Sequence, residues 1–175
     1  MRLPRIALAA YGFALAIIVL DQITKALILG SVDIADPRLI PDGYRFAEVM
    51  PGILDLTMVR NTGVSFNLFG GGEARWFLTV FSIVVSAALA IWALRTQRRT
   101  LVTAIGLVMG GAIGNVIDRI RFGYVVDFID FSDTGLFPWV FNVADSAISI
   151  GVLLLILDSL RPETPAKVGA AHEKS

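Results

Sequence analysis

Acidic side chains, carboxamides and an arginine gather between two apolar segments of this 175-residue chain, from Gly110 to Asp145. Five aspartates lie there: Asp118, Asp127, Asp130, Asp133 and Asp145. Asn115, Arg119 and Asn142 accompany them. Ionisable groups close to the hydrocarbon core of a membrane are costly and usually mark a functional site. We therefore expect an active site built on two of these aspartates.

Two carboxylates held close together share a proton, because the charge on one raises the pKa of the other. The ionised member then acts as a general base on water, and the protonated member donates to a carbonyl oxygen or a leaving amine. Such a pair hydrolyses a peptide bond without a metal or a covalent intermediate. Asp145, within an apolar segment, and Asp127, in an apolar loop between Val125-Val126 and Phe128-Ile129, are the best candidates. Spacing alone leaves Asp130 open as a rival to Asp127, whereas Asp133 is typical of a solvated turn.

Composition argues against several other mechanisms. The chain has no cysteine, and its single histidine, His172, lies in a polar C-terminal segment. A thiol nucleophile and thiolate metal sites are thus excluded, and a serine–histidine pair nearly so. A serine–lysine pair using Lys25 remains open, although Asp21 is the nearer partner of Lys25. Net charge is zero, so nothing indicates a nucleic-acid partner. We expect neither a metal nor another cofactor.

Long apolar segments predict an integral membrane protein. Hydrophobic residues make up 55% of the chain and charged residues 17%, against about a quarter charged in soluble domains. About 20 mainly apolar residues span a bilayer. We therefore predict an all-α protein with four transmembrane helices, near residues 6–29, 74–94, 101–120 and 140–160. The first segment lacks a convincing cleavage site, so we expect it to be retained.

The segment between the first two helices is expected to fold outside the bilayer. Turn signals at Asp36-Pro37 and Pro41-Asp42-Gly43 exclude a continuing helix. Apolar and polar residues alternate over residues 54–59, which predicts a half-buried strand. Residues 64–68 are a candidate for another strand. Together they indicate a small extracytoplasmic β element within residues 31–73.

Basic residues near the helix ends predict the orientation. They are Arg2, Arg5, Arg95, Arg98, Arg99, Arg161, Lys167 and Lys174. In a four-span arrangement all of them lie on one side, which places both termini in the cytoplasm. Residues 1–160 then form a single membrane-embedded domain, and residues 161–175 form a polar cytoplasmic tail.

The same arrangement brings distant polar groups to the outer membrane surface. A helix rises 1.5 Å per residue, so Asp21 lies about 22 Å along the first helix. Lys25 follows one turn later on the same side. Polar residues of the third and fourth helices reach this level: Asn115, Asp118, Arg119, Asn142 and Asp145. Asn61, in the outer insert, is within reach of it. Each one alone is compatible with an ion pair, interfacial solvation or a helix cap, but their convergence favours a shared site.

Five motifs in order resemble those of a known family. They are Asp21-Gln22-x-x-Lys25, Asn61-Thr62-Gly63-Val64-Ser65-Phe66, Gly110-Gly111-Ala112-x-Gly114-Asn115-x-x-Asp118-Arg119, Val126-Asp127-Phe128 and Phe141-Asn142-x-Ala144-Asp145. Over residues 6–160 the chain resembles the lipoprotein signal peptidases, the type II signal peptidases of bacteria.

The resemblance implies an aspartic endopeptidase of the bacterial inner membrane. Such enzymes remove the signal peptide from prolipoproteins, on the N-terminal side of a cysteine that already carries diacylglycerol. The resemblance implies Asp127 and Asp145 as the catalytic dyad, which resolves the choice between Asp127 and Asp130. It implies that four residues line the site and three support it: Asn61, Asn115, Arg119 and Asn142, and Asp21, Lys25 and Asp118. It further implies a β cradle that holds substrate at the membrane lipid, and inhibition by the cyclic peptide globomycin. We expect a monomer.

A small proton-coupled transporter is the alternative, because carboxylates within a membrane also serve proton relays. Its polar groups would have to extend through the full membrane thickness, whereas here they gather at one interface. A non-enzymatic anchor protein would explain the helices but leave Asp145 without a role.

Overall fold

A computed structural model of the protein describes residues 4–63 and 73–161. The helices are α1 (Arg5–Leu29), α2 (Glu73–Ala93), α3 (Arg99–Arg121) and α4 (Val143–Ser159), with short 3-10 helices η1 (Pro37–Leu39) and η2 (Ser132–Thr134). The strands are β1 (Arg45–Met50), β2 (Leu54–Asn61), β3 (Val125–Asp130) and β4 (Val140–Phe141). The strand expected at residues 64–68 and the tail after residue 161 lie outside the described residues, as do Arg2, Lys167, His172 and Lys174.

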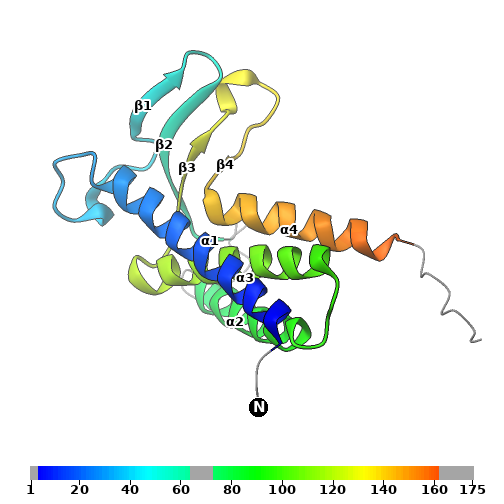
Figure 1. Cartoon of the computed structure of the whole chain (residues 1–175). Coiled ribbons are helices and arrows are strands. Elements are labelled where there is room, and N and C mark those ends of the chain that lie inside the picture. Colours follow the sequence, from blue (N-terminus) through cyan, green and yellow to red (C-terminus); the bar gives the residue numbers. More distant parts are fainter. Residues whose placement is uncertain (1–3, 64–72, 162–175) are drawn as a thin grey trace, which may run out of the picture.

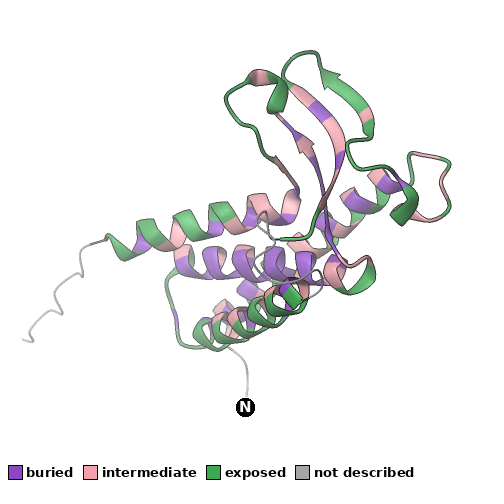
Figure 2. Cartoon of the chain, turned by 180° about the vertical axis from the view of Figure 1, so that it is seen from behind, coloured by how far each residue is buried: buried purple, intermediate pink, exposed green. Residues whose placement is uncertain are grey.

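Helix α3 is the centre of the helical layer. Of its apolar membrane-length segment 72% is buried, against 22% for α1 and 17% for α2, and Figure 2 shows α3 buried along most of its length. Glycines allow this packing. A Cβ added to Gly110 would lie 2.7 Å from the carbonyl oxygen of Ala14 in α1, and one added to Gly111 would collide with the carbonyl oxygen of Ala144 in α4. Small residues let membrane helices approach to backbone contact in this way.

Helices α1, α2 and α3 are each long and apolar enough to cross a membrane. Large apolar side chains point outward from the helical layer, as expected of a surface in contact with lipid. Examples are Leu15 and Leu27 in α1, Phe77 and Val84 in α2, and Leu153 and Ile156 in α4. The membrane-length helices and this apolar outer surface indicate a membrane protein.

Helix α4 is shorter than the predicted residues 140–160, because residues 140 and 141 form β4 and Asn142 caps the helix.

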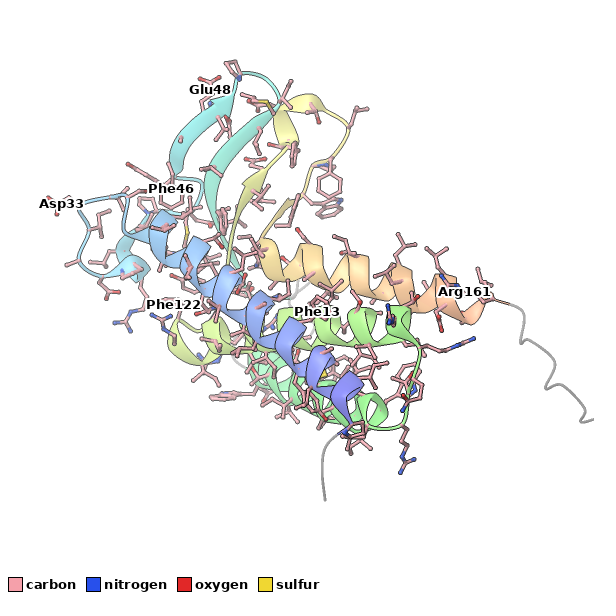
Figure 3. The ribbon with its side chains drawn as sticks, viewed as in Figure 1. Phe13, Asp33, Phe46, Glu48, Phe122 and Arg161 are labelled. Carbon is pink, nitrogen blue, oxygen red and sulfur yellow. The ribbon has the colours of Figure 1, made fainter. Side chains whose placement is uncertain are left out.

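The β part is larger than expected and comes from two connections. The strands form one antiparallel sheet in the order β1-β2-β3-β4. Strands β3 and β4 lie in the connection between α3 and α4, outside the β element predicted within residues 31–73. The sheet stands beside the helical layer, and α4 starts where the chain leaves β4 (Figure 1). Figure 3 shows Glu48 at the tip of the sheet and Arg161 at the far end of α4.

One face of the sheet packs on a cluster of apolar side chains, which are Leu29, Ile40, Met58, Tyr124, Val126 and Phe128. Arg60 holds the segment after α1 against this face. Its guanidinium donates to the carbonyl oxygens of Arg38, at 2.7 Å, and Ile40, and it lies over the ring of Tyr124. Because successive side chains in a strand alternate between faces, Asn61 and Asp127 project from the opposite face.

Candidate active site

Asp127 is buried at the middle of β3, with both of its carboxylate oxygens hydrogen-bonded. Asp127 lies opposite Val59 of the neighbouring strand β2. Asn61 is two residues further along β2, so its side chain lies on the same face of the sheet. Asn61 Nδ2 donates to Asp127 Oδ2 over 2.9 Å, and Asn142 Nδ2 donates to Asp127 Oδ1 over 2.6 Å. Asp127 therefore lies on a strand, not in the apolar loop that the sequence suggested.

Asp145 occupies the first turn of α4 and belongs to a capping box with Asn142. The Asp145 backbone N–H donates to Asn142 Oδ1 over 2.9 Å, and Asn142 N–H donates to Asp145 Oδ2 over 3.3 Å. Asn115 Nδ2, from α3, donates to the other oxygen, Asp145 Oδ1, over 2.8 Å. Asp145 therefore takes part in a helix cap, which was one of the predicted alternatives. The same carboxylate also accepts a hydrogen bond from α3.

Asn142 connects the two aspartates. It is fully buried, and its amide donates to Asp127 Oδ1, to the carbonyl oxygen of Val126 and to Asn115 Oδ1. Burial raises the pKa of Asp127 to about 7, and the negative charge of Asp145 contributes to the rise. A neighbouring pair in which one carboxyl group keeps its proton near neutral pH is the arrangement that acid–base catalysis requires.

A buried ion cluster supports both aspartates. Lys25 Nζ lies 2.9 Å from Asp21 Oδ2 and 2.7 Å from Asp118 Oδ2. Asp118 Oδ2 accepts from the backbone N–H of Val126, next to Asp127. Asp21 Oδ1 accepts from the backbone N–H of Ala144, next to Asp145. The cluster therefore fixes the backbone beside each member of the candidate dyad.

Gln22 also belongs to this cluster, although it was not among the predicted site residues. Its Nε2 donates to Asp118 Oδ1 over 3.0 Å and to the carbonyl oxygen of Gly114, and its Oε1 accepts from Arg121. The available signal was its position in the motif between Asp21 and Lys25. Gln22 extends the cluster from α1 across to the end of α3.

Arg119 lies beside the dyad without joining the ion cluster. It interacts electrostatically with Asp127, Asp145 and Asp118. Its Nη2 lies 3.8 Å from the position a Cβ would take on Gly63. Its Nε is buried and has no hydrogen-bond partner within the described part of the chain. The guanidinium thus places positive charge beside both candidate catalytic aspartates.

The rival aspartates lie away from this centre. Asp130 accepts from the backbone N–H of Ser132 at 2.9 Å and is paired across the sheet with Asp55. Asp133 lies 3.7 Å from Arg45, which also pairs with Asp55 at 2.8 Å. These groups form a separate charged cluster toward the other end of the sheet. Among residues 4–63 and 73–161, no three acidic or histidine side chains are grouped to hold a metal ion.

A pocket of about 370 Å³ opens beside Asp127. Its walls are the end of β2 with the turn that follows (residues 59–63), Asp127 itself, and residues 138–140 at the start of β4. Pro138 and Trp139 were not predicted as site residues, because these residue types carry no catalytic signal. A pocket of this size bordering the dyad is the natural candidate for a substrate subsite.

Comparisons with known proteins agree with the motifs. The family model for signal peptidase (SPase) II matches residues 13–161. A lipoprotein signal peptidase of Caulobacter vibrioides is 48% identical over 156 residues, covering 88% of each chain. One of Rhizorhabdus wittichii is 41% identical, covering 90% of each chain. A solved bacterial membrane enzyme superposes with a TM-score of 0.72 at 32% identity, over 89% of this chain and 94% of its own. The chain therefore belongs to the signal peptidase II family.

Proposed function

We propose that this protein is an aspartic endopeptidase that cleaves the signal peptide from diacylglyceryl-modified prolipoproteins, on the N-terminal side of the lipidated cysteine. The relatives named as lipoprotein signal peptidases support the substrate class. One structural observation carries the mechanism. Asp127 and Asp145 are both bound to the buried Asn142, although they come from a strand and a helix 18 residues apart.

In the proposed reaction, Asp145 takes a proton from a water molecule as the water oxygen attacks the scissile carbonyl carbon. Asp127, whose raised pKa keeps a proton available, donates it to the carbonyl oxygen. The tetrahedral intermediate collapses as the amine of the cysteine leaves with a proton returned by the dyad. Arg119 stabilises the developing negative charge. Asn61, Asn115 and Asn142 hold the carboxylates in place without adding charge of their own.

We further propose that α4 is a fourth membrane span. Its 17 residues extend over about 26 Å, near the lower limit for crossing a bilayer. Residues 1–160 would form one domain of the bacterial inner membrane, with both termini in the cytoplasm and the dyad near the outer face. The placement of Arg98 and Arg161 around Asp158, at the end of α4 remote from Asp145, supports this orientation. Globomycin sensitivity and a monomeric state are expected.

The direct test is cleavage of a diacylglyceryl precursor by purified protein in detergent, with chelator present and no ion gradient. Wild type should cleave it, whereas Asp127→Asn and Asp145→Asn should each lose at least about a hundredfold in rate, the usual contribution of a positioned acid or base. Asp130→Asn, in the same strand as Asp127, is the matched control and should stay within about threefold of wild type. Near-normal activity in either dyad variant would refute the mechanism. A folded wild type that cleaves nothing would favour the transporter alternative.

A further inference from the structure

We propose that the pocket beside Asp127 binds the mature part of the precursor, the two or three residues that follow the lipidated cysteine, and that Trp139 is its specificity-determining residue. This inference rests on the proposed function and assigns the pocket to one part of the substrate. The occupant is a short extended peptide.

The composition of the walls selects this occupant. Every lining residue within the described ranges 4–63 and 73–161 belongs to the sheet or to its loops, and none of these belongs to a helix. A precursor has two apolar parts, the signal helix and the diacylglyceryl group, which remain in the bilayer beside the helices. The mature chain is the part that continues outside the membrane. A pocket whose described walls come from the sheet therefore matches the mature chain better than either of the apolar parts.

The distance to the dyad fits the first residues after the cysteine. Asp127 forms part of the pocket wall, so an occupant lies directly next to the scissile bond. An extended chain advances at most about 3.3–3.6 Å per residue, so two or three residues cover roughly 10 Å. The volume of about 370 Å³ falls within the roughly 300–1,000 Å³ of pockets that hold small ligands.

The turn after β2 couples this pocket to the catalytic centre. Asn61 Oδ1 accepts from the backbone N–H of Gly63 over 2.8 Å, while Asn61 Nδ2 donates to Asp127. Gly63 has a φ of 87°, a backbone conformation that favours glycine. One side chain thus sets both the pocket wall and the orientation of the carboxyl group, so a bound mature segment would be aligned with Asp127.

Trp139 supplies the contact surface. Trp139 is 67% exposed, so its ring is available to a bound segment. A tryptophan that becomes buried against a partner contributes a large contact area. Pro138 and Val59 extend the apolar wall, and Thr62 contributes a hydroxyl group. This combination suits a residue with an apolar or planar side chain, flanked by peptide groups that need polar partners.

Trp139 also provides a direct readout, because the chain has three tryptophans. The variant Trp76→Phe/Trp92→Phe/Asp145→Asn keeps Trp139 as the single fluorophore and is inactive by design. One probe is a diacylglyceryl-cysteine carrying four mature residues, and the other is the same lipidated cysteine ending as an amide. We expect the first to shift the emission saturably, with an affinity at least fivefold higher than the second. Equal responses to both probes would assign the contact to lipid and overturn the proposal, as would no response to the first.

Kinetics give a second, independent test. Trp139→Ala should raise KM for a full precursor at least fivefold while kcat changes less than twofold, and Trp139→Phe should recover most of the loss. For a substrate ending at the cysteine amide, the ratio of the KM of Trp139→Ala to the KM of wild type should shrink toward one. Trp76→Ala, on the exposed side of α2, is the control for general effects of losing a tryptophan. An equal loss on both substrates would show a structural role and overturn the proposal. If wild type cleaves neither substrate, the proposed function fails, and the fluorescence measurement alone decides the pocket.

Discussion

Asn142 donates a 2.6 Å hydrogen bond to Asp127 from the position that caps helix α4. Both side chains are buried. The start of a helix and the middle of a strand are therefore joined by one carboxamide, which has no charge to compete with the aspartates. We expect the spacing of the candidate dyad to depend on this bond, and the capping function of Asn142 can be separated from it by substitution.

Asn142→Ser should keep the helix cap, because serine caps nearly as well as asparagine, but it loses the reach to Asp127. We expect normal folding with cleavage at least tenfold slower. Asn142→Ala should show the same loss of rate and a further destabilisation of about 1 kcal/mol from the missing cap. Thermal unfolding and the cleavage assay measure the two effects separately. Full activity in Asn142→Ser would mean that capping alone explains the residue.

Lys25→Met should strongly destabilise the protein. Asp21 and Asp118 are fully buried, and both lie within 3 Å of the lysine nitrogen. Removing one partner of a buried ion pair typically costs about 3–5 kcal/mol, because the remaining charge stays buried. The triple variant Lys25→Met/Asp21→Asn/Asp118→Asn should regain part of this stability. The yield of monodisperse protein after heating provides the measurement, and a stable single variant would contradict the proposed role of the cluster.

Activity should decline as the pH rises through about 7, because Asp127 then loses the proton it donates. Stability should change in the same direction. Between the ordinary carboxyl pKa of 3.8 and about 7, the folded protein binds more protons than the unfolded chain. The free energy of unfolding of wild type therefore falls as pH rises through this window.

Asp127→Asn lacks this titration, so it provides the comparison for the pH effect. The unfolding temperature of the variant minus that of wild type should increase from pH 4 to pH 8. Parallel curves over this range would show that Asp127 does not hold a proton at neutral pH.

Gly111→Ala should disturb the site through packing. Its Cβ would meet the carbonyl oxygen of Ala144, next to Asp145, and overpacking of this kind costs about 1–3 kcal/mol. We expect a lower unfolding temperature and reduced cleavage. Gly12→Ala is the matched control, since nothing lies within 4 Å of the added Cβ, and glycine in a helix costs about 1 kcal/mol relative to alanine. It should be neutral or stabilising, and equal behaviour of the two variants would argue against close packing at Gly111.

The orientation can be tested with single cysteines, because the chain has none. A cysteine replacing Glu48, exposed at the tip of the sheet, should react with a membrane-impermeant maleimide in intact spheroplasts. A cysteine replacing Gln97, exposed between α2 and α3, should react only after permeabilisation. The reverse pattern would invert the proposed topology while leaving the dyad untouched.

Local sequence patterns were enough to predict three membrane-length helices, a strand near residues 54–59 and the polar groups at the helix ends. These follow from local patterns, since a long apolar segment and a two-residue alternation are properties of neighbouring residues. The motifs also indicated Asp127 and Asp145 by resemblance. The proximity of Asn115, Asn142 and Asp145 was also expected, because the ends of the third and fourth helices must meet across a short connection.

The position of Asp127 on a strand depends on long-range pairing and was not predictable from the sequence. The sequence Val125–Asp130 lacks the alternation of a half-buried strand, because nearly all of its residues are buried on both faces of the sheet. Its pairing with β2, more than 60 residues earlier, turns Asn61 toward Asp127. The same long-range pairing creates the pocket beside Trp139. Contacts between segments so distant in the chain leave no local pattern, so the position of the pocket beside Asp127 became visible only in the folded molecule.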